Sequence, residues 1–171
     1  MHLIERDKAG GFKLAIALTE CLEKIEHCNV CSNLTECQPC LICADPERSD
    51  SLLCVISSPA DIVAIEKSGL FTGKYHCLNG LLSPLDGLGP QEIGLPLLIE
   101  RIQTYRPDEV LIALASTVEG EATTHQIVSL ASGISRVTRL AQGVPVGGEL
   151  DQIDMSTLAQ AFMARNEVSK G

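Results

Sequence analysis

The chain has 171 residues, 45% of them hydrophobic and 3% aromatic, and its 13 Lys and Arg against 22 Asp and Glu give a formal net charge of −9. This charge excludes a surface that coats DNA broadly, because each phosphate contact requires a Lys or an Arg. Any nucleic-acid contact must come from a local patch, an oligomer's cavity or a segment outside this chain. No apolar run approaches the roughly 20 residues of a membrane helix. The charged start, 1–7, lacks the apolar stretch of a signal peptide, so we expect a cytoplasmic protein without a membrane partner.

The first part of the chain carries an amphipathic helix pattern. Its apolar positions recur at helical spacing at Leu14, Leu18, Leu22 and Ile25. We expect this helix after Gly11, ending near His27. The next segment, 28–43, is polar and rich in Cys, and Pro39 does not suit a helix interior. It cannot bury a core of its own, and 45–50 reads as a polar connection.

From Ser51 onward, strand and helix patterns alternate. Strands are expected at 52–56, 75–78, 110–114 and 137–140, and helices at 59–68, 95–105, 126–130 and 156–164. Ser58 and Pro59 form a helix start and Gly69 a helix end. An acidic turn is expected at 119–121 and a turn or oligomer contact at 143–148. The alternation predicts an α/β fold with a mostly parallel sheet covered on both faces.

Four cysteines have the spacing of a structural zinc site, Cys28-x2-Cys31-x8-Cys40-x2-Cys43. Two residues between thiolates let each pair form a tight knuckle, and two knuckles complete a tetrahedron with no open position. Binding contributes about 10–16 kcal/mol in small zinc peptides, enough to order a segment without a core. The alternative is free thiols or a redox Cys-x-x-Cys pair, but paired knuckles favour the metal.

The remaining cysteines are expected outside this site. Cys37 forms a further Cys-x-x-Cys pair with Cys40 and could compete for the metal, but we place it outside the ligand shell. His27 is an alternative ligand that is more simply a bystander. The cysteines in apolar elements are expected to be small core residues: Cys21, Cys54 and Cys77.

Several motifs follow one another in a fixed order. They are His27–Cys31, Cys40–Pro46, Ser51–Val55, Ser58–Asp61, Leu82–Gly87, Thr117–Thr123 and Gly143–Leu150. Together they resemble the RecR family of bacterial recombination mediators over the stretch from near 1 to about 164. The resemblance implies an N-terminal helix (1–27), a zinc module (28–43), a doubly wound Toprim domain (51–140) and a C-terminal tail (141–171) used in oligomer contacts.

The same resemblance implies a function. Members of this family are non-catalytic DNA repair proteins that act with RecO and RecF. They help to load the strand-exchange recombinase at gapped or single-stranded DNA, and they form rings that can encircle duplex DNA. We therefore expect DNA, RecO, RecF and further copies of the chain as partners.

The chain departs from the family pattern at three places. The family opens with a helix-hairpin-helix, of which 1–7 resembles only the end, so we expect a remnant with weakened DNA binding. Ser57 replaces the Glu that Toprim enzymes carry after the first strand. Residues 114–116 replace the usual Thr-Asn-Pro, which puts any inherited binding role of that loop in doubt.

An acidic site remains at Glu119, Glu121 and Asp61. In Toprim enzymes, a Glu after the first strand and an acidic pair hold Mg²⁺ for phosphoryl chemistry. Because Ser57 removes one carboxylate, we prefer an interpretation in which Glu119 and Glu121 stabilise the N-terminus of a helix and serve partner binding. Isolated His76 and His125 are expected to be surface or core residues. The basic pair Arg136 and Arg139 is expected to be solvated.

Two competing functions remain open. The first is a magnesium-dependent Toprim nuclease or primase-like enzyme that uses Glu119, Glu121 and Asp61. The second is an oligomerisation module stapled by zinc that has lost the repair role.

Overall fold

The computed structural model describes residues 2–165. They form two units, one ending at Thr138 and the other beginning at Arg139. The expected tail is thus described only as far as Arg165. No helix within the described range is both long and apolar enough to cross a membrane.

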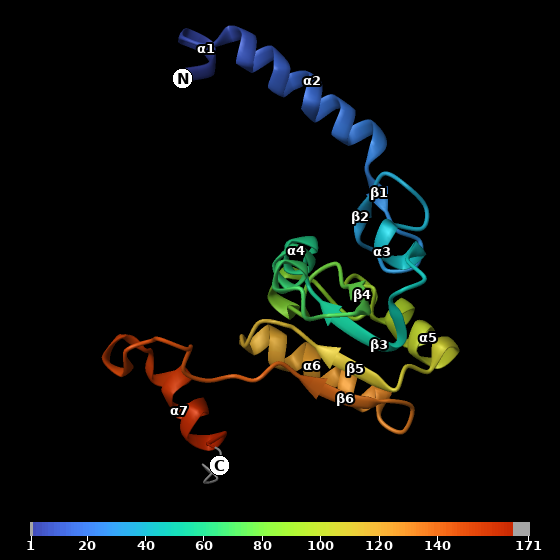
Figure 1. Ribbon diagram of the computed structural model, residues 1–171, viewed down its shortest axis with the longest axis vertical. Helices are drawn as coiled ribbons and strands as arrows, with labels where there is room; N and C mark the ends of the chain where they lie inside the picture. The colour runs from blue at the N-terminus through green and yellow to red at the C-terminus, as the bar shows by residue number, and fades with distance from the viewer. Residues whose placement is uncertain (1, 166–171) are drawn as a thin grey trace. The chain divides into compact units, whose positions relative to one another are not determined.

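A four-stranded sheet is the centre of the first unit (Figure 1). Its strands are β3 (Ser49–Ile56), β4 (Gly73–Cys77), β5 (Glu109–Ile112) and β6 (Arg136–Arg139), in the order β4-β3-β5-β6. The central strand β3 runs parallel to both of its neighbours, with Leu53 opposite Lys74 on one side and Val110 on the other. The predicted α/β class with a parallel sheet is confirmed.

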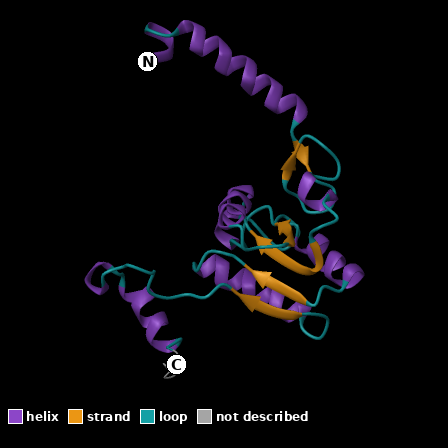
Figure 2. Ribbon diagram, viewed as in Figure 1, coloured by secondary structure: helices purple, strands orange, loops and turns teal. Residues whose placement is uncertain are grey.

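Helices cover both faces of this sheet (Figure 2). They are α4 (Pro59–Ser68), α5 (Leu95–Tyr105) and α6 (Val118–Ala131). Because successive side chains of a strand point to opposite faces, β3 contributes to two cores. Val55 packs in the cluster that contains Leu98 of α5 and Ile127 of α6, whereas Cys54 packs in the cluster that contains Ile62 of α4. Cys54 and Val55 are both wholly buried.

Local signals placed most helix ends correctly. Ser58 is the N-cap of α4, its side chain accepts a hydrogen bond from the Ala60 amide, and Asp61 completes a capping box. Gly69 ends the helix at φ 65°, a left-handed conformation that favours glycine. The expected acidic turn at 119–121 is wrong, because Thr117 caps α6 and these residues form its first turn.

The N-terminal segment comprises α1 (His2–Glu5) and α2 (Lys8–Lys24). Asp7 starts α2 earlier than expected, since its carboxylate accepts a hydrogen bond from the Gly10 amide at 2.8 Å. The helix ends before His27 because β1 (Glu26–His27) pairs with β2 (Leu34–Thr35).

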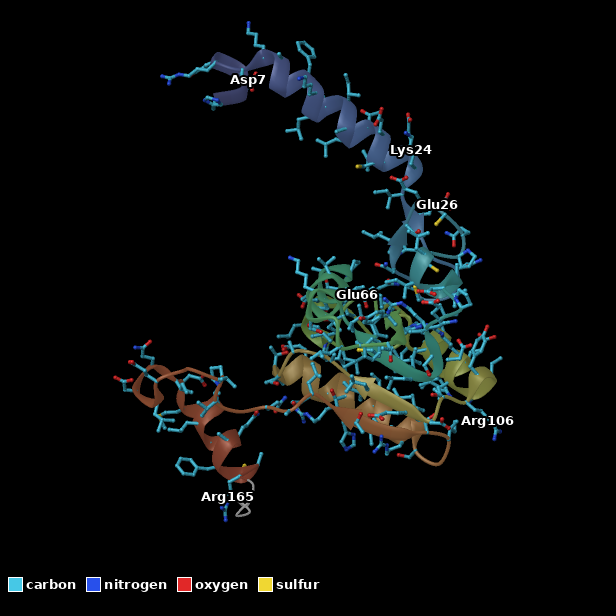
Figure 3. All side chains as sticks on the ribbon, viewed as in Figure 1. Asp7, Lys24, Glu26, Glu66, Arg106 and Arg165 are labelled. Atoms are coloured by element: carbon cyan, nitrogen blue, oxygen red, sulfur yellow. The ribbon has the colours of Figure 1, made fainter. Side chains whose placement is uncertain are left out.

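None of the α2 residues is buried (Figure 3, between Asp7 and Lys24). Leu18 is 56% exposed and Leu22 is 86% exposed, so the predicted apolar face is exposed. The expectation that Cys21 is a core residue is therefore wrong, and its thiol is exposed. Cys54 and Cys77 are buried as predicted.

The second unit contains η2 (Leu150–Gln152) and α7 (Met155–Met163). Asp154 caps α7 by accepting hydrogen bonds from the amides of Ser156 and Thr157. The 143–148 segment contains a turn, which is closed by a hydrogen bond of 3.0 Å from the Gly148 amide to the Pro145 carbonyl. α7 agrees with the helix predicted at 156–164, to within one residue at each end.

Arg48 joins three parts of the first unit. Its guanidinium binds both carboxylate oxygens of Glu66 on α4 and the Gly73 carbonyl at 3.1 Å. The Tyr75 hydroxyl donates to the same Glu66 carboxylate at 2.5 Å. The hydrogen bonds from Arg48 hold the pKa of Glu66 below its ordinary value. The expected polar connection at 45–50 thus contains a tertiary anchor.

We expect Glu66→Gln to lower the free energy of unfolding at pH 7 by about 1 kcal/mol, because it removes the charged partner of a half-buried Arg48. The folded pKa of Glu66 lies below the unfolded value of about 4.3, so its contribution is present above that pH and is lost as the pH falls through the folded pKa. Urea unfolding at pH 7 and pH 3 measures the difference. Glu47→Gln, an exposed control, should change little, and an equal loss in both variants would contradict the assignment.

Candidate functional site

The cysteine module (26–44) brings the four predicted ligands together. Cys28 and Cys31 follow β1, whereas Cys40 is the N-cap of α3 (Leu41–Ala44) and Cys43 lies within that helix. A hydrogen bond of 2.9 Å from the Ser32 amide to the Cys28 carbonyl closes the first knuckle. Ser32 itself adopts φ 60°, which turns the chain back sharply.

The four sulfurs form a compact group. All four Sγ atoms lie within 4.8 Å of one another, and those of Cys31 and Cys40 are 3.6 Å apart. A tetrahedron with metal–sulfur bonds of about 2.3 Å has edges of about 3.8 Å. Three of the thiols are buried and Cys43 is partly exposed. The donor set and its spacing fit a thiophilic metal ion.

Backbone amides support the thiolate form of Cys28. Burial raises its pKa, but hydrogen bonds from the backbone amides of Cys40, Val30 and Cys31 outweigh burial and lower the value to about 7. The opposite holds for Cys40, whose pKa is raised to about 11 by burial and by the neighbouring Cys31. Four thiols in one small volume ionise together only at a high cost, which a bound cation would relieve.

The two alternative ligands lie outside this group. Cys37 is exposed, with its sulfur 3.6 Å from the Thr35 hydroxyl. The His27 Nδ1 lies 2.9 Å from the Ser32 carbonyl and takes no place among the sulfurs. Both positions agree with the sequence-based expectation.

Sequence reasoning missed Gln38. Its side chain donates to the His27 carbonyl at 2.9 Å and accepts from the Asn29 amide at 3.0 Å. Gln38 therefore holds the loop between the knuckles against the end of β1, and no sequence signal indicated this.

The cysteine module is attached to the sheet. The Cys77 amide at the end of β4 donates to the Cys31 carbonyl at 2.8 Å. Ile42 of α3 packs against the module's cysteines and also against the core cluster under α4. The four-cysteine group thus lies against the edge strand β4 of the sheet.

The acidic residues are arranged differently. Glu119 and Glu121 are exposed in the first turn of α6, where the helix dipole favours acids. Asp61 instead accepts hydrogen bonds from the Ser58 amide at 2.9 Å and the Ser57 hydroxyl at 3.3 Å. Within residues 2–165, the four cysteines form the one group of three or more side chains spaced to hold a metal.

Gly120 lets the loop before α6 approach closely. A Cβ at this position would lie 1.8 Å from the Ala115 carbonyl oxygen, so only glycine fits. The segment that replaces the usual Thr-Asn-Pro, 114–116, is therefore packed against the first turn that carries both glutamates.

The isolated basic and histidine residues can be compared with their expected positions. The Arg136 side chain is 71% exposed, so it is solvated as expected, and it also forms an ion pair with Glu109. His76 is buried and His125 is exposed, both within the predicted range.

The fold and its acidic helix start define a Toprim-domain protein with an added four-cysteine module. The family model described as Toprim domain matches residues 51–141, and the one described as RecR, C-terminal matches 143–166. The recombination protein RecR of Acinetobacter baylyi is 49% identical over 166 residues, which cover 96% of this chain and 84% of that protein. RecR of Stutzerimonas stutzeri is 49% identical over 171 residues, covering 99% and 85%. The chain belongs to the RecR family.

We expect protein purified under reducing conditions to carry one thiophilic metal ion per chain, measured by plasma mass spectrometry. Cys40→Ser should lose the ion, because it removes one of four converging thiols. Cys37→Ser is the matched control and should retain it. Retention by the first variant, or loss by the second, would show that the ligand set is different.

Proposed function

We propose that this protein is a recombination and DNA repair mediator that acts without turnover, through contacts with DNA, RecO and RecF. The observation that carries the proposal is the 49% identity to recombination proteins RecR over nearly the whole chain. Its sites fit binding better than chemistry. Ser57 stands where Toprim enzymes carry a Glu, and Asp61 is engaged in capping α4.

The metal in this proposal is structural zinc, held by Cys28, Cys31, Cys40 and Cys43. A site with four protein ligands leaves no open position for a substrate. The buried residues of the module's own cluster are cysteines, so zinc would supply the cohesion that apolar side chains supply elsewhere. The module can then present a firm surface beside β4.

Assembly of several copies is part of the same proposal. Most of the stability of helices in proteins comes from packing of an apolar face, yet no residue of α2 is buried. Leu18 and Leu22 of the predicted apolar face are more than half exposed, and large exposed apolar side chains indicate a contact surface. We assign this face to contact with another copy of the chain, so that DNA can be held by an assembly although each chain is acidic.

Glu119 and Glu121 are the proposed contact for RecO or RecF. Both are exposed in the first turn of α6, two residues apart, on either side of Gly120, whose backbone packs closely against Ala115. Exposed charged groups select partners with complementary charge.

The test is a binding measurement on the full chain. We expect Glu119→Gln/Glu121→Gln to weaken binding to RecO or RecF by at least about tenfold, equivalent to about 1.4 kcal/mol. The control Glu36→Gln/Glu47→Gln removes two exposed charges elsewhere and should bind normally.

Two outcomes would overturn the proposal. Wild-type protein that binds neither RecO nor RecF would leave a zinc-stapled oligomerisation module. Magnesium-dependent nicking of supercoiled DNA, abolished by Glu119→Gln, would make the protein an enzyme.

A further inference from the structure

A cleft lies between the cysteine module and the α/β domain. It is lined by Val30 and Cys43 from the module and by strand and helix residues of the domain, among them Lys74 and Arg101. Cys43 is the partly exposed member of the four-thiol group, whereas the other three are buried. The metal site therefore meets this cleft through Cys43.

The two cations of the cleft differ in their partners. The Lys74 ammonium lies 2.6 Å from the Asp50 carboxylate, which also lines the cleft and neutralises it. The Arg101 Nη1 donates to the Tyr75 carbonyl at 2.6 Å, a neutral acceptor. No carboxylate of residues 2–165 lies within ion-pair distance of Arg101. Arg101 thus brings an uncompensated positive charge to the cleft.

The negative charge of a zinc–tetrathiolate site would be the counterpart of the positive charge of Arg101. Zn²⁺ bound by four thiolates carries a net charge of −2, in a chain whose own net charge is −9. Such a site gains from nearby cations, and outer partners of metal ligands commonly change metal affinity by about 10–100-fold. Of the two cations that line the cleft together with Cys43, Arg101 is the one that no carboxylate of residues 2–165 pairs with.

A second connection runs through β4. Arg101 donates a hydrogen bond to the Tyr75 carbonyl. Two residues further along β4, the Cys77 amide donates a hydrogen bond to the Cys31 carbonyl. Between them His76 is buried, and its pKa is lowered to about 3 by burial and then by the charge of Arg101. His76 is therefore neutral, and the charge of Arg101 reaches the strand beside the metal site.

We propose that Arg101 is a positioning residue of the metal centre. Its guanidinium offsets the negative charge of the tetrathiolate site across the cleft, and its hydrogen bond holds the strand that carries Cys77. Helix α5 of the α/β domain thereby sets how tightly the cysteine module retains its ion. This inference rests on the proposed zinc site.

The test is the zinc dissociation constant of the full chain, measured by competition with a chelating dye, with circular dichroism as a check of folding. We expect Arg101→Gln to weaken zinc binding by about tenfold, and Arg101→Lys, which keeps the charge, to restore most of the affinity. Arg136→Gln removes a charge remote from the cleft and should bind as the wild type does. Affinity unchanged in Arg101→Gln, or equally low in Arg101→Lys, would overturn the role of the charge.

A second variant avoids any loss of folding at Arg101. The Asp50 side chain is 73% exposed, so Asp50→Asn leaves the core intact while it releases the charge of Lys74 into the cleft. We expect this variant to bind zinc more tightly than the wild type, and equal or weaker binding would count against the inference. Wild-type protein without zinc would refute the zinc site itself, whereas zinc-bound protein insensitive to all these variants would refute only the assignment of Arg101.

Discussion

The convergence of four thiols is the constraint on which the first half of the structure depends. The cysteine module has no apolar core, and its buried side chains are Cys28, Cys31 and Cys40 themselves. Thiols this close repel one another once ionised, so binding of a metal ion to them would be coupled to the folding of the module. The backbone amides that point at Cys28 prepare the group for a cation.

The α/β domain does not share this dependence. Its two hydrophobic clusters, one on each face of the sheet, supply ordinary apolar cohesion. The module is joined to it by the Cys77–Cys31 hydrogen bond and by Ile42, and the cleft lined by Cys43 and Arg101 lies between them. Domain and module can therefore influence each other although each has its own source of stability.

The acidic side chains of the Toprim domain are arranged in a way that fits the proposed binding role better than phosphoryl chemistry. The carboxyl ends of parallel strands are where α/β proteins gather ligands, and in this chain that edge carries Ser57, a capping Asp61 and two exposed glutamates. Helix α2, none of whose residues is buried, carries the second contact surface of the proposal. Both features suit a protein that works through assemblies.

The sequence alone determined the features that local chemistry controls. Apolar runs placed the strands, Ser58, Pro59 and Gly69 placed the ends of α4, and the cysteine spacing identified the four thiols that converge. Such signals act within a few residues, so they can be interpreted from the sequence without knowledge of the fold.

Only the tertiary structure decided contacts between distant segments. Arg48 meets Glu66 and Arg101 meets the carbonyl of Tyr75 because the sheet brings these elements together, and no local pattern marks either pair. The exposure of Cys21 was missed for the converse reason, since helical spacing predicts an apolar face but not whether the same chain covers it.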